Sequence, residues 1–230
     1  MLLQEEKMEE KKSYASEGQE EITRKGNPRK PQGEEGFSML RRMNESHGPV
    51  TEWALGFLNF QENDRALDIG CGGGATLQRI SKRIGKGHLT GVDYSPVSVE
   101  LSKKTNRKDI ADGKMEIVEA SVEELPFSDS SFDKIVTVES FYFWPDPEEN
   151  LKEVYRVLAE DGTFLLVADI YQKEGLAREV LENIERYQLY NPTPEHFREL
   201  FETAGFVEIA VHTEEDTDWI CVEGKKTAEK

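Results

Sequence analysis

Short apolar runs alternate with amphipathic segments between residue 65 and residue 169. Apolar runs without polar alternation, rich in β-branched residues, are typical of strands that are buried on both faces of a sheet. The segments between them carry apolar residues at helical spacing, as at Leu77, Ile80 and Ile84. We expect strands at residues 65–70, 87–93, 115–120, 132–138 and 163–169, and helices at residues 75–85, 96–106 and 148–162. Because strands and helices alternate, the pattern predicts an α/β fold, a parallel sheet with helices on both of its faces.

The last part of the chain has a different pattern. Thr193 and Pro194 are typical of a helix start, and Gly205 is typical of a helix end. Residues 207–213 and 218–224 are two expected strands with only a few polar residues between them. Since parallel strands need a long crossover, so short a link predicts an antiparallel pair at the end of the chain.

The first part of the chain is expected to lie outside the folded core. Residues 1–35 are almost entirely charged or polar, which predicts a disordered or fraying tail. Removal of residues 1–30 is therefore expected to leave ligand binding unchanged. Apolar residues at roughly helical spacing begin at Phe37 and continue in residues 51–60. We expect a single domain at residues 36–230 that opens with a helical lead-in or lid at about residues 37–62.

The composition narrows the classes of protein. The 230 residues are 37% hydrophobic, which is enough for the core of one domain. The formal net charge of −17, without a block of Lys and Arg, disfavours binding to nucleic acid or to an anionic membrane. The sequence shows no signal peptide and no apolar stretch of transmembrane length, and Cys71 and Cys221 form no disulfide or metal-ligand pattern. We expect a cytoplasmic protein with reduced thiols and with no nucleic-acid or membrane partner.

The candidate chemistry is concentrated in LDIGCGGG at residues 67–74, between the first expected strand and the first expected helix. Such a loop places backbone N–H groups and the positive end of a helix at the carboxyl edge of the sheet, where open α/β folds bind ligands. Gly70, Gly72 and Ala75 satisfy the dinucleotide pattern GxGxxG/A, and Asp93 lies near the expected position of the ribose acid. An NAD(P)-binding oxidoreductase is therefore one candidate.

Two carboxylates favour a different nucleoside. Asp68 lies at the end of its strand, two residues before Gly70, where it would repel a pyrophosphate but pair with an ammonium group. Asp93 ends the second expected strand, where it can accept hydrogen bonds from ribose hydroxyls. A ligand with an amino acid at one end and a sugar at the other suits both acids. S-adenosylmethionine has this composition together with a sulfonium charge.

Four segments in order, LDIGCGGG, GVDYS, ASVEELPFSDSSFDKIV and LKEVYRVLAEDGTFLLV, resemble the class I S-adenosylmethionine-dependent methyltransferases. The resemblance is greatest to the small-molecule group called methyltransferase type 11. It implies a Rossmann-like, doubly wound, mostly parallel sheet of seven strands, in which the last strand is antiparallel. This agrees with the antiparallel pair that the end of the chain predicts.

The resemblance also implies roles for individual residues. Asp68 and Gly70 would hold the methionine end of the cofactor, and Asp93 would hold the ribose. Gly72 and Gly74 would let the cofactor lie against the backbone. The residues expected at the cofactor are Asp68, Gly70, Cys71, Gly72, Gly74, Asp93, Tyr94, Ser121, Val122 and Glu139.

The adenine site departs from the family pattern. Many such enzymes have an aspartate facing the adenine amino group where this chain has Ser121. The serine hydroxyl can still accept a hydrogen bond, and the Val122 backbone can supply another, although without the assistance of a charge. Ser121 can also be an ordinary residue at the end of a strand.

The acceptor is expected beyond the fourth strand. Methyl transfer from a sulfonium is an in-line displacement, so a protein can promote it by aligning the nucleophile and excluding water. The aromatic run at residues 138–147, VESFYFWPDP, either walls an apolar pocket there or packs in the core. The lead-in could fold over the same crevice. The expected acceptor-pocket residues are Met43, Asn44, Phe141, Phe143 and Trp144, and the candidate bases are His47, Tyr142 and Tyr171.

Missing motifs limit the acceptor. No NPPY or DPPY follows the fourth expected strand, which argues against the amino groups of nucleobases. No acids and histidines stand at metal-ligand spacing, so no metal is expected. The sequence predicts an S-adenosylmethionine-dependent methyltransferase that acts on an oxygen, nitrogen, sulfur or carbon atom of a small molecule. The alternatives are an NAD(P) oxidoreductase and a non-catalytic S-adenosylmethionine sensor or partner subunit, and the oligomeric state stays open.

Overall fold

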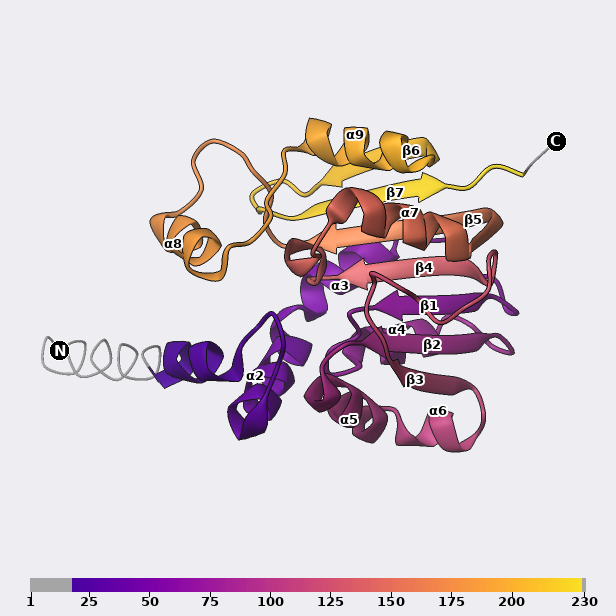
Figure 1. Ribbon diagram of the computed structural model, residues 1–230, viewed down its shortest axis with the longest axis horizontal. Coiled ribbons are helices and arrows are strands. Elements are labelled where there is room, and N and C mark those ends of the chain that lie inside the picture. The colour runs from indigo at the N-terminus through magenta and orange to yellow at the C-terminus, as the bar shows by residue number, and fades with distance from the viewer. Residues whose placement is uncertain (1–17, 229–230) are drawn as a thin grey trace, which may run out of the picture.

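The computed structural model describes residues 18–228. At its centre is a seven-stranded sheet with the order β3-β2-β1-β4-β5-β7-β6 (Figure 1). The strands are β1 Arg65–Ile69, β2 His88–Asp93, β3 Met115–Glu119, β4 Phe132–Val138, β5 Leu158–Ala168, β6 Val207–Thr213 and β7 Ile220–Lys225. The helices are α2 Gly33–Ser46, α3 Gly48–Leu55, α4 Ala75–Ser81, α5 Pro96–Thr105, α6 Arg107–Ala111, α7 Pro147–Val157, α8 Arg178–Tyr187 and α9 Pro194–Ala204, with a 3₁₀ turn at Phe141–Phe143. β1 to β5 pair in parallel and β7 pairs antiparallel with β5 and β6, which confirms the predicted fold class.

The strand order reverses at β1. This strand has β2 on one side and β4 on the other, with Asp68 level with Gly91 of β2 and with Val136 of β4. The connections leave this point in opposite directions, which opens a crevice at the carboxyl ends of the strands. In Figure 1 the arrowheads of β1 and β4 point to one edge of the sheet, and α2 lies beyond that edge. Open α/β sheets bind their ligands at such a point.

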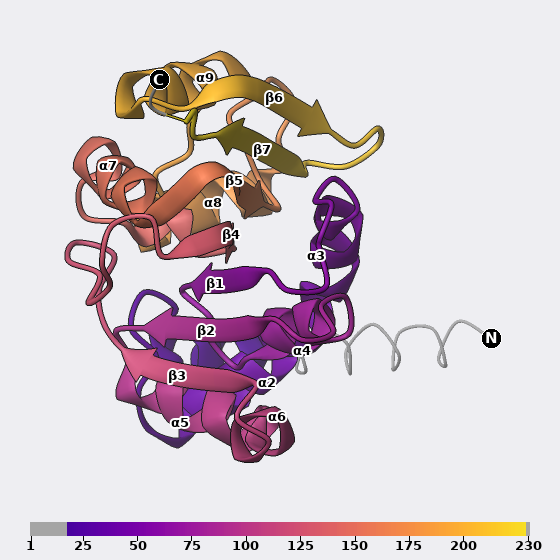
Figure 2. The same ribbon diagram turned by 90° about the vertical axis from the view of Figure 1, so that its right-hand side faces the viewer.

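Two apolar clusters cover the two faces of the sheet. One packs α7 and α9 against one face, and its fully buried members include Ile135, Phe164 and Phe197. The other packs α3, α4 and α5 against the opposite face through residues such as Leu77 and Leu165. Figure 2 shows α7 and α3 on opposite sides of the strands. Phe164 and Leu165 face different clusters because successive side chains of a strand point to opposite faces.

Three helices begin with a capping side chain that is followed by proline. The cap oxygen accepts a hydrogen bond from a backbone N–H of the first turn, which would otherwise have no partner. Proline fits the next position because it has no N–H to leave unpaired. These starts confirm the helices predicted at residues 96 and 194. The bonds run from Ser98 to Ser95 of α5 at 3.3 Å, from Glu149 to Asp146 of α7 at 3.2 Å and from His196 to Thr193 of α9 at 3.2 Å.

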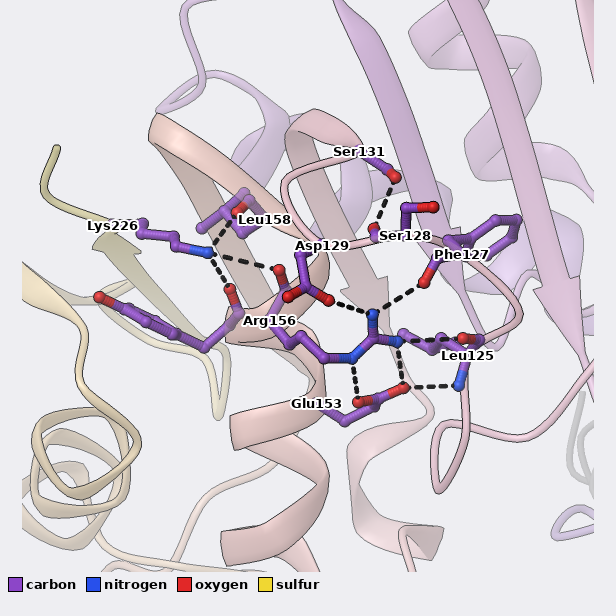
Figure 3. A network of polar contacts seen from close by, with 10 residues as sticks. Leu125, Phe127, Ser128, Asp129, Ser131, Glu153, Arg156, Leu158 and Lys226 are labelled. Carbon is purple, nitrogen blue, oxygen red and sulfur yellow. Dashed lines mark hydrogen bonds and ion pairs between the residues drawn. The ribbon is translucent and has the colours of Figure 1, made fainter. Parts of the chain in front are cut away.

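A polar network ties the end of α7 to the loop before β4 and to the end of the chain after β7 (Figure 3). The Arg156 guanidinium pairs with Glu153 at 2.7 Å and with Asp129 at 2.8 Å, and it also donates to two carbonyl oxygens of that loop. Lys226 donates to backbone carbonyl oxygens at the C-terminal end of α7, where open carbonyls and the helix dipole favour a cation. The network holds the amino ends of β4 and β5, at the edge of the sheet opposite the crevice.

The structure differs from the sequence prediction in the first 35 residues. Residues 1–17 of the predicted tail lie outside the described residues, whereas residues 18–26 form a helix and residues 27–32 lead into α2. Arg42 of α2 holds that helix, because its guanidinium donates to the Gln19 carbonyl at 3.3 Å and to the Thr23 hydroxyl at 2.5 Å. Polar contacts therefore order a segment whose lack of apolar residues predicted a tail.

Two element boundaries also differ. The predicted lead-in consists of two helices, because α2 ends at Ser46 and α3 begins at Gly48, with His47 at the joint. β5 begins at Leu158, where the sequence predicted a continuing helix up to residue 162. None of the helices within residues 18–228 combines the length and the apolar character that crossing a bilayer requires.

Candidate cofactor and acceptor site

A cavity of about 290 Å³ lies at the carboxyl edge of the sheet. The segments that follow β1, β2, β3 and β4 line one side of it, and α2 together with residues 28–31 lines the other. This volume is close to the lower end of the range of small-molecule sites, roughly 300–1,000 Å³. The predicted site residues that line it are Met43, Asn44, His47, Gly70, Cys71, Gly72, Asp93, Tyr94, Ser121, Val122, Glu139, Phe143 and Trp144. The predicted site residues outside its lining are Asp68, Gly74, Phe141, Tyr142 and Tyr171.

In the glycine loop, residues 70–74, a Cβ at Gly70, Gly73 or Gly74 would collide with a neighbouring side chain, and at Gly70 and Gly74 the backbone φ is positive as well. Gly70 has φ +74°, and an added Cβ would lie 2.4 Å from the Ser140 side chain. Gly74 has φ +82°, and an added Cβ would lie 2.4 Å from the Asn106 amide. A side chain at either position would therefore strain the backbone and collide with a neighbour. Gly74 does not lie against the cavity, in contrast to the role that the family resemblance implied.

Helix α2 packs directly on the glycine loop. The Asn44 amide donates to the Gly73 carbonyl at 3.2 Å, and a Cβ at Gly72 would come within 3.6 Å of Leu40. Cys71 is buried beneath this contact, its thiol 3.7 Å from the Ser102 hydroxyl, and burial raises the pKa of the thiol. The lead-in thus lies over the loop.

Asp68 is a buried acid without a partner. It is 1% exposed, and its Oδ2 has no hydrogen bond among the described residues. Desolvation, and secondly the nearby charge of Asp93, raise the pKa of this carboxyl to about 8. Although Asp68 does not line the cavity, the next two residues of the chain, Ile69 and Gly70, do. A cation arriving at the loop would relieve the cost of ionising this acid.

Asp93 connects the end of β2 to the glycine loop. Its Oδ2 accepts from the Gly72 N–H at 3.0 Å and its Oδ1 accepts from the Ser95 N–H at 2.9 Å. Burial raises the pKa of this carboxyl, although both hydrogen bonds oppose the shift. Each carboxylate oxygen can still accept a second hydrogen bond, as a pair of sugar hydroxyls requires.

The segment after β3 carries the residues expected at adenine. The Ser121 hydroxyl donates to the Glu123 carboxylate at 2.9 Å and accepts from the Glu123 N–H at 3.2 Å. Its hydrogen is therefore already used within the segment. Glu123 lines the cavity and was not predicted, because the family pattern directs attention to the position that Ser121 occupies. Val122 is almost fully buried beside it.

The aromatic run after β4 divides between the cavity and the core. Phe143 and Trp144 line the cavity, and the Trp144 indole donates to the Ser140 hydroxyl at 3.4 Å. Phe141 was predicted in the acceptor pocket but lies in the core, 1% exposed and with its ring 5.5 Å from that of Phe197. The tight 3₁₀ turn explains the division, because it points successive side chains in different directions.

The two tyrosines predicted as bases do not line the cavity. Tyr171 follows β5 and lies beside Lys173, whose ammonium is 5.0 Å from the centre of the tyrosine ring. Tyr142 is 5% exposed, and its hydroxyl lies 2.8 Å from Glu139 Oε2 and 2.9 Å from Asp169 Oδ1. The same hydroxyl accepts from the Asp169 N–H at 3.0 Å. Tyr142 therefore joins two acids instead of facing a ligand.

Those two acids belong to a cluster with the third predicted base, His47. One ligand atom from each of His47, Glu139 and Asp169 lies within 4.8 Å of the other two, and we call these residues the acid–histidine cluster. Burial raises the pKa of Glu139 well above its usual range, with further contributions from the Asp169 charge. Burial also lowers the pKa of His47. The sequence did not single out Asp169, although it follows a buried strand at the same edge as Asp68 and Asp93.

Residues 28–31, which we call the N-terminal strap, line one side of the cavity through Pro28, Arg29 and Pro31. The Tyr94 hydroxyl donates to the Arg29 carbonyl, and the Ser95 hydroxyl donates to the Pro31 carbonyl at 2.6 Å. The Arg29 guanidinium lies over the Phe143 ring at 5.5 Å. The sequence prediction had placed this segment in a tail outside the site, because residues 1–35 are almost entirely charged or polar. The contacts that hold it use backbone carbonyls, which every residue has.

The topological switch at β1, with acids at the carboxyl ends of the adjacent strands β1 and β2, is the place where open α/β folds bind nucleotide-type ligands. Residues 67–166 match the family model described as "Methyltransferase domain". The 2-methyl-6-phytyl-1,4-hydroquinone methyltransferase 2 of Oryza sativa subsp. japonica is 33% identical over 145 residues, which cover 63% of this chain and 39% of that protein. The sarcosine/dimethylglycine N-methyltransferase of Halorhodospira halochloris is 28% identical over 62% of this chain and 51% of that protein. The chain thus spans less than two thirds of the length of these curated relatives.

Solved structures share the fold. The phosphoethanolamine N-methyltransferase 2 of Haemonchus contortus in complex with S-adenosyl-L-methionine matches with a TM-score of 0.72 and 16% identity, over 84% of this chain and 57% of that chain. At this identity the likeness shows the fold alone. The family match over residues 67–166 supports the resemblance to the class I S-adenosylmethionine-dependent methyltransferases seen in the sequence, and the solved structures agree with it in fold.

Proposed function

We propose that the protein is an S-adenosylmethionine-dependent methyltransferase that acts on a small-molecule acceptor. The observation that carries this proposal is the pair of buried acids at the glycine loop, Asp68 without a partner and Asp93 with free acceptor capacity. A pyrophosphate would bring negative charge to both acids, whereas the methionine end and the ribose of S-adenosylmethionine supply a cation and hydroxyl donors. The residues present therefore suit this cofactor better than NAD(P).

The cofactor, when bound, supplies an activated methyl group on a positively charged sulfur. Asp68 would pair with its ammonium group, Asp93 would accept from its ribose hydroxyls, and the Val122 backbone would lie at its adenine. Glu123 adds a carboxylate at the adenine end, in place of the aspartate that Ser121 replaces. These assignments rest on which residues line the cavity, together with Asp68 behind it.

The acceptor would bind at the end of the cavity that Met43, Phe143 and Trp144 line. Their apolar surfaces and the N-terminal strap would exclude water and keep the acceptor in line with the methyl group. A cavity of about 290 Å³, lined on one side by residues 28–31, suits a small molecule better than a nucleic acid. The acceptor atom, a cytoplasmic location and the absence of nucleic-acid and membrane partners stay predictions.

Calorimetric titration tests the proposal. The wild-type protein and the Asp93→Ala variant are each titrated with S-adenosylmethionine, S-adenosylhomocysteine and NADH. Asp112→Ala is the matched control, because Asp112 is an exposed acid that does not line the cavity. We expect saturable binding of the first two ligands and none of NADH. Binding of NADH alone would favour the oxidoreductase. Binding of the first two ligands without methyl transfer to any phenol, amine, thiol or carboxylate in a broad screen would favour a sensor.

A further inference from the structure

The acid–histidine cluster lies in one corner of the cavity and is assembled from three distant parts of the chain. His47 joins α2 to α3, Glu139 follows β4, and Asp169 follows β5. Their ligand atoms all lie within 4.8 Å of one another. His47 and Glu139 also line the cavity, so the cluster has access to small solutes. The sequence predicted no metal ligands, because residues this far apart show no spacing pattern.

Two of the donors in the cluster have no partner within the protein. Glu139 Oε1 is buried and makes no hydrogen bond among the described residues. The His47 ring makes no hydrogen bond within residues 18–228. Glu139 also has φ +56°, an unusual conformation for a residue with a side chain. A buried carboxylate oxygen left open at a strained position points to a missing ligand.

The two acids of the cluster form no ion pair with Arg or Lys within residues 18–228. The single hydrogen of the Tyr142 hydroxyl cannot serve both Glu139 Oε2 and Asp169 Oδ1, although each lies within hydrogen-bond distance. Neither acid pairs with an arginine within the described part of the chain, and the nearby Arg42 donates to Gln19 and Thr23. Two carboxyl groups this close together, with no Arg or Lys partner among the described residues, favour the binding of a cation.

We propose that His47, Glu139 and Asp169 bind a divalent transition-metal ion such as Mn²⁺, Fe²⁺ or Zn²⁺. One imidazole nitrogen with two carboxylate oxygens suits these ions, whereas Mg²⁺ and Ca²⁺ prefer oxygen ligands alone. Metal–ligand bonds of about 2.0–2.2 Å place donors of one ion up to roughly 4.4 Å apart, so a small shift of the side chains closes the site. Tyr142, which contacts both carboxylates, acts as a positioning residue.

Three protein ligands leave coordination positions open, and the cavity lies on the side of His47 and Glu139. A metal ion there can bind an oxygen of a small molecule and withdraw charge from it. In the proposed methyltransferase this molecule would be the acceptor, which makes phenols and carboxylic acids the acceptors to test first. This last step rests on the proposed function, whereas the metal site itself does not.

Metal titration tests the site without any enzymatic activity. The full-length protein, produced without a polyhistidine tag and treated with a chelator, is titrated with MnCl₂, ZnCl₂ and MgCl₂ by calorimetry. We expect Mn²⁺ or Zn²⁺ to bind at one equivalent per chain and more tightly than Mg²⁺. His47→Ala and Asp169→Asn should each weaken binding at least about tenfold, and Tyr142→Phe should weaken it less. His88→Ala, at the opposite edge of the sheet, should leave binding unchanged.

Several outcomes would overturn the metal site. One is the absence of stoichiometric Mn²⁺ or Zn²⁺ binding to the wild-type protein, and another is full binding to His47→Ala. Circular dichroism and S-adenosylhomocysteine titration of each variant identify those that fail to fold. The same ligand separates the two proposals, because metal binding without S-adenosylhomocysteine binding would defeat only the proposed function. The reverse result would defeat only the metal site.

Discussion

The two sides of the cavity are built in different ways. On the sheet side, Asp68 and Asp93 are 1% and 8% exposed and lie at the carboxyl ends of the paired strands β1 and β2. On the other side, the N-terminal strap is held by hydroxyls that donate to its backbone carbonyls and by a cation over an aromatic ring. The sheet side therefore carries desolvated charge on a rigid frame, whereas the strap is attached by a few neutral or exposed contacts.

This difference predicts that the sheet side determines the affinity for a ligand and that the strap determines how fast the ligand enters and leaves. Buried charges interact strongly because water does not screen them, so they set the affinity for a charged ligand. A segment held by a few hydrogen bonds can open at low cost, which a covered cavity needs if ligands are to enter. Substitutions on the sheet side should change stability and affinity greatly, and substitutions at the strap should act mainly on the rates of binding.

The largest effect is expected at Asp68 and concerns stability against pH. The pKa of this carboxyl is about 8 in the folded protein and 3.8 as the ordinary value, so between these pH values the folded state keeps a proton that the unfolded chain has lost. Stability should therefore fall as pH rises through this range and level off above about pH 8, at up to about 1.4 kcal/mol per pH unit. Asp68→Asn has no ionisable group at this position, so its free energy of unfolding should not show this decline. At pH 8 its free energy of unfolding should exceed that of the wild type by several kcal/mol.

Urea unfolding at pH 5, 6.5 and 8 measures this difference directly. The difference in the free energy of unfolding between the wild type and Asp68→Asn removes the effect of the other acids, which titrate alike in both proteins. S-adenosylmethionine should also reduce the decline in the wild-type protein, because its ammonium group would stabilise the ionised Asp68. Parallel curves for Asp68→Asn and the wild type would show that Asp68 is ionised in the folded state without a ligand.

The second effect concerns the affinity for the cofactor. Asp93→Ala removes the proposed acceptor of the ribose hydroxyls and also the bonds that hold the Gly72 and Ser95 N–H groups. Loss of charge-assisted hydrogen bonds should weaken S-adenosylhomocysteine binding by at least ~1.5 kcal/mol, or more than about tenfold. Calorimetry measures this loss, with Asp112→Ala as the control. Unchanged affinity would remove Asp93 from the cofactor site.

The sheet side was largely predictable from the sequence, because its features are local. A glycine loop between an apolar strand and an amphipathic helix, with acids at the ends of two strands, identifies the switch point of an α/β sheet. The antiparallel strand pair at the end of the chain followed from the short link between its strands, and the number of strands followed from the family resemblance. Asp169 obeys the same rule as Asp68 and could have been found by it. The sequence did not show that Gly74 serves the packing of Asn106, which depends on a helix beyond the next strand.

The strap and the acid–histidine cluster could not be predicted in the same way. The strap is held through the backbone carbonyls of Arg29 and Pro31. Because every residue has a backbone carbonyl, these contacts do not depend on the residue type and cannot be recognised in the sequence. The cluster joins residues 47, 139 and 169, which only the folded chain brings together. Phe141 and Phe143 are the same type of residue in the same aromatic run, but the 3₁₀ turn points Phe141 into the core and Phe143 toward the cavity.

The third effect concerns the tether of the strap. Tyr94→Phe removes the hydroxyl that donates to the Arg29 carbonyl and leaves the ring in place. Loss of one neutral hydrogen bond should cost about 0.5–1.5 kcal/mol. We expect the dissociation rate of S-adenosylhomocysteine to rise several-fold in stopped-flow experiments, with little change in the association rate. Tyr155→Phe, a half-buried tyrosine beside Phe206, is the control. If Tyr94→Phe lost as much affinity for S-adenosylhomocysteine as Asp93→Ala, the two sides of the cavity would not differ in their contribution to affinity.

The smallest effect is expected at Arg29, whose guanidinium lies 5.5 Å from the centre of the Phe143 ring. Arg29→Ala removes this contact but keeps the carbonyl that Tyr94 binds, and an exposed cation–π contact contributes about 0.5–1 kcal/mol. Dissociation of S-adenosylhomocysteine should therefore accelerate no more than about fivefold. Arg107→Ala, an exposed arginine of α6, controls for the loss of charge.

A double-substitution cycle decides whether this contact acts as described. If Arg29 acts through the ring, Phe143→Leu should give a similar acceleration, and Arg29→Ala added to it should give no more. Additive effects would mean that Arg29 contacts the ligand itself, because its loss would then matter without the ring. In that case the strap would contribute a charge to the site, and the sheet side would not be the sole source of electrostatic recognition.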